Sequence, residues 1–468
     1  MMAGWQGKRV VVVGLARQGL ALARYLAPLG CHLVLNDRRP AEEMQAAKDS
    51  LQDLSNQVDH PIEWVFGGHP LEILEGTDMV FPSGGVPLSN PLIVEAQGRG
   101  IPLSNDSQLF LEAAPCPVIG ITGSAGKTTT TTLVGRIAMA GHQGGQVWVG
   151  GNIGSPLISC LDQVQPADLA VMELSSFQLE IMTRSPGIAA VLNITPNHLD
   201  RHATMDEYTA AKARILEYQT SGDVAVLGYD DPIAWSLAEK AIGQVYAFGL
   251  ASPAPGIPGC YVKEDVLYLR KGGSETQIMS RDQVGLRGEH NLMNVLAACT
   301  IAAAAELPVE AMQAGVAGFT GVAHRLEFVR TCKGADWYND SIATAPERAM
   351  AAIRSFDEPL VLLAGGRDKN LPWEEFASLV SQRVDHLVLF GEAKEVIKKA
   401  LNSMAGRQAS MKTSVQECKG LKDAVLTAST LAEAGDVVLL SPGGTSFDEF
   451  YDFEERGEAY KRWVMELQ

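Results

Sequence analysis

The sequence predicts an α/β protein of three domains, each built on a mostly parallel sheet. Short β-branched or apolar runs alternate with segments of helical periodicity along the chain, as in parallel sheets covered by helices. At 468 residues the chain is too long for one ordinary hydrophobic core. Proline and glycine clusters interrupt it near residues 115 and 320. We therefore expect domains at residues 1–114, 115–322 and 323–468.

The first predicted domain begins like a doubly wound nucleotide-binding sheet. A β-branched run at residues 8–14 ends in glycine, and a helical pattern, a second strand at residues 32–36 and Asp37 follow it. The turn Gly14–Gly19 lacks the third glycine of the dinucleotide fingerprint, although Asp37 could bind a ribose hydroxyl. From these residues alone, a dinucleotide oxidoreductase and a UDP-binding domain both remain open.

The second predicted domain contains a phosphate-binding loop between a strand at residues 118–122 and a helix at residues 127–140. Its glycines let backbone N–H groups face phosphate oxygens, and the helix N-terminus adds partial positive charge. Lys127 is expected to reach the β- and γ-phosphates and Thr128 to bind Mg²⁺, although Ile121 holds the place of the usual first glycine. The ATP-binding residues predicted in this loop are Gly123, Ser124, Ala125, Gly126, Lys127, Thr128 and Thr129.

Further strands indicate how the second and third domains continue. In the second domain we expect strands at residues 169–173, 189–194 and 224–227, a helix at 291–306 and a glycine-rich linker at 315–321. In the third domain, apolar runs at residues 360–364, 386–390 and 437–441 alternate with helical segments and predict another α/β unit.

Composition narrows the class of protein. The formal net charge of −17 argues against non-specific nucleic-acid binding, and no apolar stretch is long enough to span a bilayer. The seven cysteines are scattered singly, which gives neither zinc spacings nor a disulfide framework. The N-terminal residues lack the pattern of a signal peptide. We therefore expect a cytoplasmic protein.

Several separated motifs follow the phosphate loop in a fixed order. They are Gly150–Gly154, Glu173–Leu179, Asn193–His202, Ala210–Lys212, Gly288–Asn291, His324–Glu327 and Asn339–Ser341. Together they resemble the Mur ligase family of bacterial peptidoglycan synthesis, within it most nearly the branch that adds glutamate to UDP-N-acetylmuramoyl-L-alanine. The resemblance covers nearly the whole chain. It implies a Rossmann-like UDP-binding first domain, a P-loop ATPase domain in the middle and a Rossmann-like C-terminal domain.

The resemblance also implies a metal and catalytic centre. Thr128, Glu173 and His198 match the positions that bind Mg²⁺ or Mn²⁺, and Lys127 matches the catalytic lysine of the loop. Lys212 would by itself be a solvated surface lysine, but it matches the lysine that the family carbamylates to hold a second metal ion. The further ATP-contacting positions are Asn291, Arg325 and Asp340.

The substrate positions are carried over in the same way. Those expected to contact the UDP substrate are Leu15, Ala16, Arg17, Asp37, Arg38, Gly84, Gly85 and Asn152. Those expected to contact the amino acid are Thr344, Lys369, Ser446, Phe447 and Phe453, of which Lys369 would pair with a side-chain carboxylate. Ile342 stands where the family usually has a lysine, so one cation of that region is absent.

The implied reaction joins D-glutamate to UDP-N-acetylmuramoyl-L-alanine through an acyl phosphate made with ATP, in a monomeric enzyme. A related ligase for another amino acid, L-glutamate included, or for a folate remains an alternative. A folate-type ligase would place the loop near its N-terminus, whereas here a complete domain precedes it. A regulatory nucleotide-binding protein is disfavoured because binding alone needs no metal cluster. Sequence reasoning leaves the glutamate enantiomer, the preferred metal and the oligomeric state open.

Overall fold

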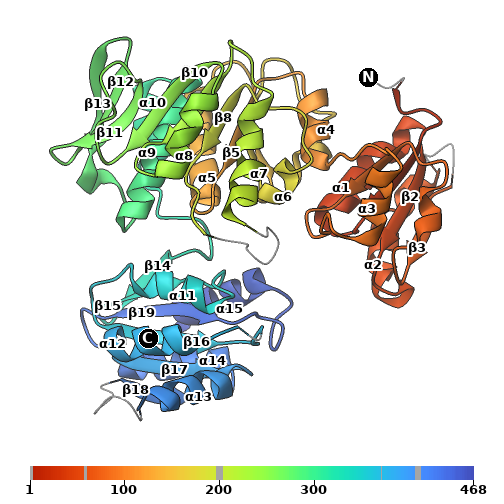
Figure 1. Cartoon of the computed structure of the whole chain (residues 1–468). Helices are drawn as coiled ribbons and strands as arrows, with labels where there is room; N and C mark the ends of the chain where they lie inside the picture. Colours follow the sequence, from red (N-terminus) through yellow and green to blue (C-terminus); the bar gives the residue numbers. More distant parts are fainter. Residues whose placement is uncertain (1–3, 57–60, 197–203, 370, 406–412) are drawn as a thin grey trace. The chain divides into compact units, whose positions relative to one another are not determined.

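The computed structural model describes residues 4–56, 61–196, 204–369, 371–405 and 413–468. The chain forms two compact units, residues 1–285 with 289–319 and residues 286–288 with 320–468. Three mostly parallel sheets with helices between their strands confirm the predicted fold class (Figure 1). Within the described residues, no helix is both long and apolar enough to cross a membrane.

The first sheet is four-stranded and parallel, with the order β3-β2-β1-β4. Its strands are β1 Arg9–Val13, β2 His32–Asp37, β3 Glu63–Phe66 and β4 Met79–Pro82. The helices of this part are α1 Arg17–Leu26, α2 Gln45–Ser50, α3 Pro91–Gly98 and α4 Asp106–Ala113. Residues 10–13 are four consecutive valines with no exposed surface, because a parallel strand covered on both faces favours an unbroken β-branched run.

The second sheet is nine-stranded, with the order β13-β12-β11-β10-β9-β8-β5-β7-β6. Its strands are β5 Val118–Thr122, β6 Val147–Gly151, β7 Leu169–Glu173, β8 Ile188–Val191, β9 Val224–Gly228, β10 Gln244–Gly249, β11 Gly259–Lys263, β12 Val266–Lys271 and β13 Ser274–Ser280. Its helices are α5 Lys127–Gly141, α6 Ser176–Leu179, α7 Met205–Glu217, α8 Pro232–Ser236, α9 Glu289–Ala304 and α10 Val309–Val316. All neighbouring strands from β6 to β11 are parallel, whereas β11, β12 and β13 form two antiparallel hairpins.

Two local predictions in this unit were wrong, and one feature was missed. The strand predicted at residues 189–194 ends at Val191, because the next residues turn toward the phosphate loop, where Asn193 bonds to Ala125. The linker predicted at residues 315–321 begins inside α10, where Gly315 lets the helix approach Ile137 closely. The β11–β13 hairpins were not predicted at all.

The third sheet has the order β14-β15-β19-β16-β17-β18 and is parallel except at its edge strand β14. Its strands are β14 Glu327–Cys332, β15 Ala335–Asn339, β16 Leu360–Gly365, β17 His386–Phe390, β18 Ser414–Glu417 and β19 Val437–Gly443. Its helices are α11 Pro346–Ile353, α12 Glu374–Arg383, α13 Lys394–Ala405, α14 Leu421–Leu431 and α15 Phe453–Glu466. One core packs Ile353, Phe376 and Ile397 and another packs Val425 and Tyr460, so both faces are covered. The carboxyl ends of β15, β16 and β19 bring three predicted site segments to one edge.

Candidate active site

The phosphate loop lies between β5 and α5, as the sequence predicted. Gly126 has a left-handed backbone with φ of 80°, and a Cβ here would lie 2.1 Å from Asn294 Oδ1, so glycine is required. Asn294 Nδ2 donates to Asn291 Oδ1 at 3.1 Å, which ties the predicted ATP-contacting Asn291 to the end of the loop. Lys127 Nζ donates to Gly123 O at 2.8 Å and stays on the loop.

Two residues that were not predicted as site residues, Asn193 and Tyr208, hold the phosphate loop through hydrogen bonds. Asn193 holds both backbone groups of Ala125, accepting from its N–H at 2.8 Å and donating to its carbonyl at 3.2 Å. Ser124 Oγ donates to Thr195 O and accepts from Tyr208 OH, both at 3.0 Å. Tyr208 is 1% exposed on α7. Its place one helical turn before the predicted metal-site lysine was the only available signal.

Glu173 of the predicted metal site accepts hydrogen bonds from two other predicted site residues. This last residue of β7 is buried, and its two carboxylate oxygens accept from Thr128 Oγ1 and from Asn152 Nδ2, both at 2.9 Å. Asn152 N also donates to Glu173 O at 3.0 Å. A carboxylate and a hydroxyl are oxygen donors of the kind that Mg²⁺ prefers, so these residues fit that ion.

Lys212 is buried beside the loop, and is not solvated as its charged neighbours alone would indicate. Its side chain is 1% exposed, its Nζ donates to Gly123 O at 2.9 Å, and the Tyr208 ring centroid lies 4.6 Å from Nζ. Burial, together with the nearby charge of Lys127, lowers the pKa of Lys212 to about 6, although Glu173 opposes the shift. At neutral pH the amine is therefore largely uncharged and nucleophilic.

His198, the third predicted metal ligand, lies outside the described residues. Among the residues that the structure does describe, no group of three or more His, Cys, Asp or Glu side chains could hold a metal ion. The predicted site is thus described through Thr128, Glu173 and Lys212.

The end of β2 is organised around the carboxylate of Asp37. Asp37 accepts from Leu15 N at 2.8 Å and from Arg39 through the backbone N, Nε and Nη2 at 2.8–3.0 Å. Despite burial, the hydrogen bonds and charge of Arg39 hold the pKa of Asp37 at about 2. These hydrogen bonds hold the turn after β1, and the contact of Asp37 with the UDP substrate stays a prediction. Arg39 was not predicted, whereas Arg38 is exposed.

A shallow cleft lies where the turn after β4 faces α6. Gly84, predicted to contact the UDP substrate, lines it together with Phe177 and Gln178 of the predicted motif. Gln178 Nε2 donates to Ser107 Oγ at 2.7 Å, and Asn105 Nδ2 donates to Gln178 O at 2.8 Å. These bonds fix α6 to the start of α4. Ala16, Arg17 and Gly85, also predicted for this substrate, are exposed.

In the second unit, Asp340 follows β15 and is buried. Its Oδ2 accepts from Ser441 Oγ at 2.8 Å and its Oδ1 accepts from Leu326 N at 3.2 Å. Burial raises the pKa of Asp340 to about 7, although these hydrogen bonds oppose the shift. Arg325 lies on a turn between two left-handed residues, His324 with φ of 62° and Leu326 with φ of 44°. Each such non-glycine residue costs about 1–3 kcal/mol.

Arg456 of α15 joins two predicted binding segments and was not predicted itself. Its side chain is fully buried, Nε and Nη2 donate to Ser341 Oγ and O at 2.9 and 2.8 Å, and Nη1 donates to Gly444 O at 3.1 Å. Burial lowers the pKa of Arg456 to about 10, so the guanidinium stays charged. It therefore links the segment after β15 to the loop after β19.

The predicted amino-acid residues gather partly around that loop. Lys369 Nζ lies 3.5 Å from Thr344 Oγ1, and burial together with the nearby charge of Arg348 lowers the pKa of Lys369. Ser446 is buried in the loop after β19. Phe447 is 60% exposed. Phe453 begins α15, and its carbonyl accepts from Ser341 Oγ at 2.8 Å. These positions stay predictions.

Comparison with known families matches three segments that cover most of the chain. Residues 8–105 match the MurD-like N-terminal domain of Mur ligases, residues 121–302 the Mur ligase middle domain and residues 324–444 the Mur ligase glutamate ligase domain. A UDP-N-acetylmuramoylalanine–D-glutamate ligase from Symbiobacterium thermophilum is 41% identical over 98% of both chains. The chain belongs to the Mur ligase family. A ligase of the same name from Caldanaerobacter subterraneus is 38% identical, again over 98% of both chains.

Solved structures share this Mur ligase fold at lower identity. A UDP-N-acetylmuramate-alanine ligase from Thermotoga maritima superposes with a TM-score of 0.58 at 18% identity, over 98% of this chain and 100% of that one. A MurF ligase from Thermotoga maritima, in complex with ADP, gives 0.55 at 16% identity over 100% and 97%. The resemblance to the Mur ligases stated from the sequence is confirmed.

Proposed function

We propose that the chain is the ligase that uses ATP to join D-glutamate to UDP-N-acetylmuramoyl-L-alanine, in the cytoplasmic synthesis of the bacterial peptidoglycan precursor. The observation that carries this proposal is the match over 98% of both chains to ligases named for that product. The convergence of Thr128 and Asn152 on Glu173 beside a phosphate loop supports it. A complete UDP-type domain before the loop agrees with a UDP-linked acceptor.

The residues suggest how the first step is assisted. The acceptor carboxylate attacks the γ-phosphate of ATP, ADP leaves, and an acyl phosphate forms. Because this step brings anions together, the loop amides, the N-terminus of α5 and Lys127 must offset their repulsion. Asn193 and Tyr208 hold the loop so that its amides need no rearrangement at that moment.

The second step forms the amide bond. The uncharged amine of D-glutamate attacks the acyl carbon, and phosphate leaves from the tetrahedral intermediate. We assign Lys369, Thr344 and Ser446 to the carboxylates of the incoming glutamate because a cation and two hydroxyls suit them. Water would hydrolyse the acyl phosphate, so the site has to exclude solvent while it waits for the amine.

We propose that Thr128 and Glu173 hold Mg²⁺ and that Lys212, as its carbamate, supplies a further anionic ligand. When bound there, such an ion would supply charge neutralisation for the anions of this step. The buried amine, with its pKa of about 6, is uncharged at neutral pH and can bond to CO₂ with loss of one proton. Native mass spectrometry should find one added CO₂ on the parent and none on Lys212→Ala, and short carboxylates should restore activity to that variant.

Phosphate release tests the proposed specificity directly. The enzyme is incubated with ATP, Mg²⁺ and UDP-N-acetylmuramoyl-L-alanine, and a panel of amino acids including both glutamate enantiomers is added. We expect release with D-glutamate and background rates with the others. Equal turnover with another amino acid would assign the chain to a different reaction of the family.

A further inference from the structure

The turn that carries Arg325 is held in a conformation that its residues do not favour. His324 and Leu326 on either side of it are both left-handed, although neither is a glycine. Such a backbone persists only when surrounding contacts fix it. The direction of Arg325 therefore depends on whatever holds the turn.

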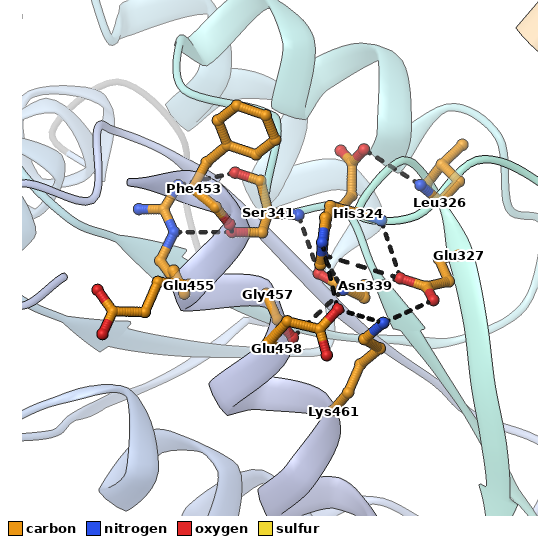
Figure 2. Close-up of polar contacts among 12 residues, drawn as sticks. His324, Leu326, Glu327, Asn339, Ser341, Phe453, Glu455, Gly457, Glu458 and Lys461 are labelled. Carbon is orange, nitrogen blue, oxygen red and sulfur yellow. Dashed lines mark hydrogen bonds and ion pairs between the residues drawn. The ribbon is translucent and has the colours of Figure 1, made fainter. Parts of the chain in front are cut away.

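Glu327 holds the turn from its far side. Its Oε2 accepts from His324 N at 2.8 Å and from Asn339 Nδ2 at 3.0 Å, so one oxygen joins the turn to β15. Its Oε1 accepts from Lys461 Nζ at 3.0 Å, as Figure 2 shows. The lysine lies on α15, two helical turns beyond the start of that helix. A single carboxylate thus connects the turn, the sheet and the helix.

Two further residues of α15, Gly457 and Glu458, lie beside His324 of the same turn. A Cβ at Gly457 would lie 2.1 Å from His324 Nδ1, so the helix leaves this position open for the imidazole ring. Glu458 lies 2.7 Å from Lys461 Nζ and 3.5 Å from His324 Nε2, but its side chain is 62% exposed. The side chains of Lys461 and Glu327 are only 23% and 20% exposed, which shields their ion pair from solvent.

We propose that Lys461 is a positioning residue, which acts through Glu327 to keep the turn of residues 324–327 in the conformation that directs Arg325 at ATP. The inference rests on the proposed function, because that function assigns Arg325 to the nucleotide. Loss of the ammonium leaves the Glu327 carboxylate with only neutral donors and frees the turn to relax. The nucleotide site then loses a correctly directed cation, while the amino-acid residues keep their own contacts.

The test compares Lys461→Met with Lys398→Met, which removes a similar ion pair to Glu417 in the same unit. Both substitutions keep an apolar stem on a helix. For Lys461→Met we expect kcat/KM for ATP and the affinity for a fluorescent ATP analogue to fall about tenfold, as for the loss of one charge-assisted hydrogen bond. The KM for D-glutamate and all constants of Lys398→Met should stay at the parent values. Lys461→Arg should recover most of the loss.

Two results would overturn the inference. One is an unchanged ATP constant in Lys461→Met, and the other is a parallel loss for ATP and D-glutamate that tracks a fall in melting temperature. If the parent itself makes no ligated product, the proposed function fails. The affinity for the ATP analogue in the two variants then still decides whether Lys461 orients the nucleotide site.

Discussion

At the residue scale, the burial of Lys212 destabilises the folded chain but provides an uncharged amine beside the phosphate loop. Among the described residues, Lys212 Nζ donates to a carbonyl, Gly123 O, and to no carboxylate. Burial therefore disfavours its charged form, and its pKa falls to about 6. The unfolded chain then binds one more proton than the folded chain between about pH 6 and pH 10. The contribution of Lys212 to the free energy of unfolding therefore rises with pH across that window. Near pH 7 most of the destabilisation caused by its burial is still present.

We predict that Lys212→Met is inactive but more stable than the parent. In CO₂-depleted buffer at pH 7, the gain in the free energy of unfolding should be about 1–4 kcal/mol, because an apolar side chain removes the burial penalty. The gain should shrink toward pH 10. Urea unfolding of both proteins at several pH values measures it, and a pH-independent difference would show that the lysine is not buried uncharged.

The same residue shows the limit of sequence reasoning. Lys212 has charged neighbours on its helix and reads as a surface lysine, because helical periodicity alone cannot reveal what covers a face. Only the family resemblance marked it. Tyr208 and Asn193 carried less signal, since their roles depend on contacts with the loop that lie 84 and 68 positions away in the chain.

At the element scale, local chemistry decided which segments were predictable. β5 and β7 were predicted with their observed ends, because an apolar run followed by glycine or an acid marks a buried parallel strand. The β11–β12 turn uses Glu264 and Asp265, both left-handed, instead of the Asn-Gly pair that usually signals such a hairpin. At the next turn, between β12 and β13, the pair Gly272 and Gly273 is another recognised hairpin signal.

The contacts of Arg456 on helix α15 predict an effect on stability. Arg456→Met should leave the carbonyls of Ser341 and Gly444 without their buried donor, at a cost of about 2–4 kcal/mol in the free energy of unfolding. Arg456→Lys keeps the charge and should lose less. Denaturant unfolding compares the two variants with the parent. Equal stability of all three would mean that this guanidinium does not hold the two segments together.

At the scale of the whole molecule, the chain passes between its two units three times, out and back around residues 285–289 and once more at residues 319–320. Gly288 and Gly321 stand at these passages with φ of 87° and 124°. Glycines with such freedom suit a hinge. Gly321 lies in the glycine-rich linker predicted at residues 315–321, whereas Gly315 of that range is helical.

We predict that the units approach one another when the site is filled, because an acyl phosphate survives only where water is excluded. Small-angle scattering should show a smaller radius of gyration with a non-hydrolysable ATP analogue, the UDP-linked acceptor and D-glutamate together than with none of them. An unchanged radius of gyration would show that the units do not close when the site is filled.

The central claim is that the acceptor carboxylate is activated by phosphoryl transfer and then captured by D-glutamate. The most direct measurement uses UDP-N-acetylmuramoyl-L-alanine labelled with ¹⁸O in its carboxylate and follows the label by mass spectrometry. With D-glutamate we expect one ¹⁸O atom in each released phosphate and the other in the new amide, with no turnover on L-glutamate. Unlabelled phosphate, or equal turnover of the two enantiomers, would contradict the account.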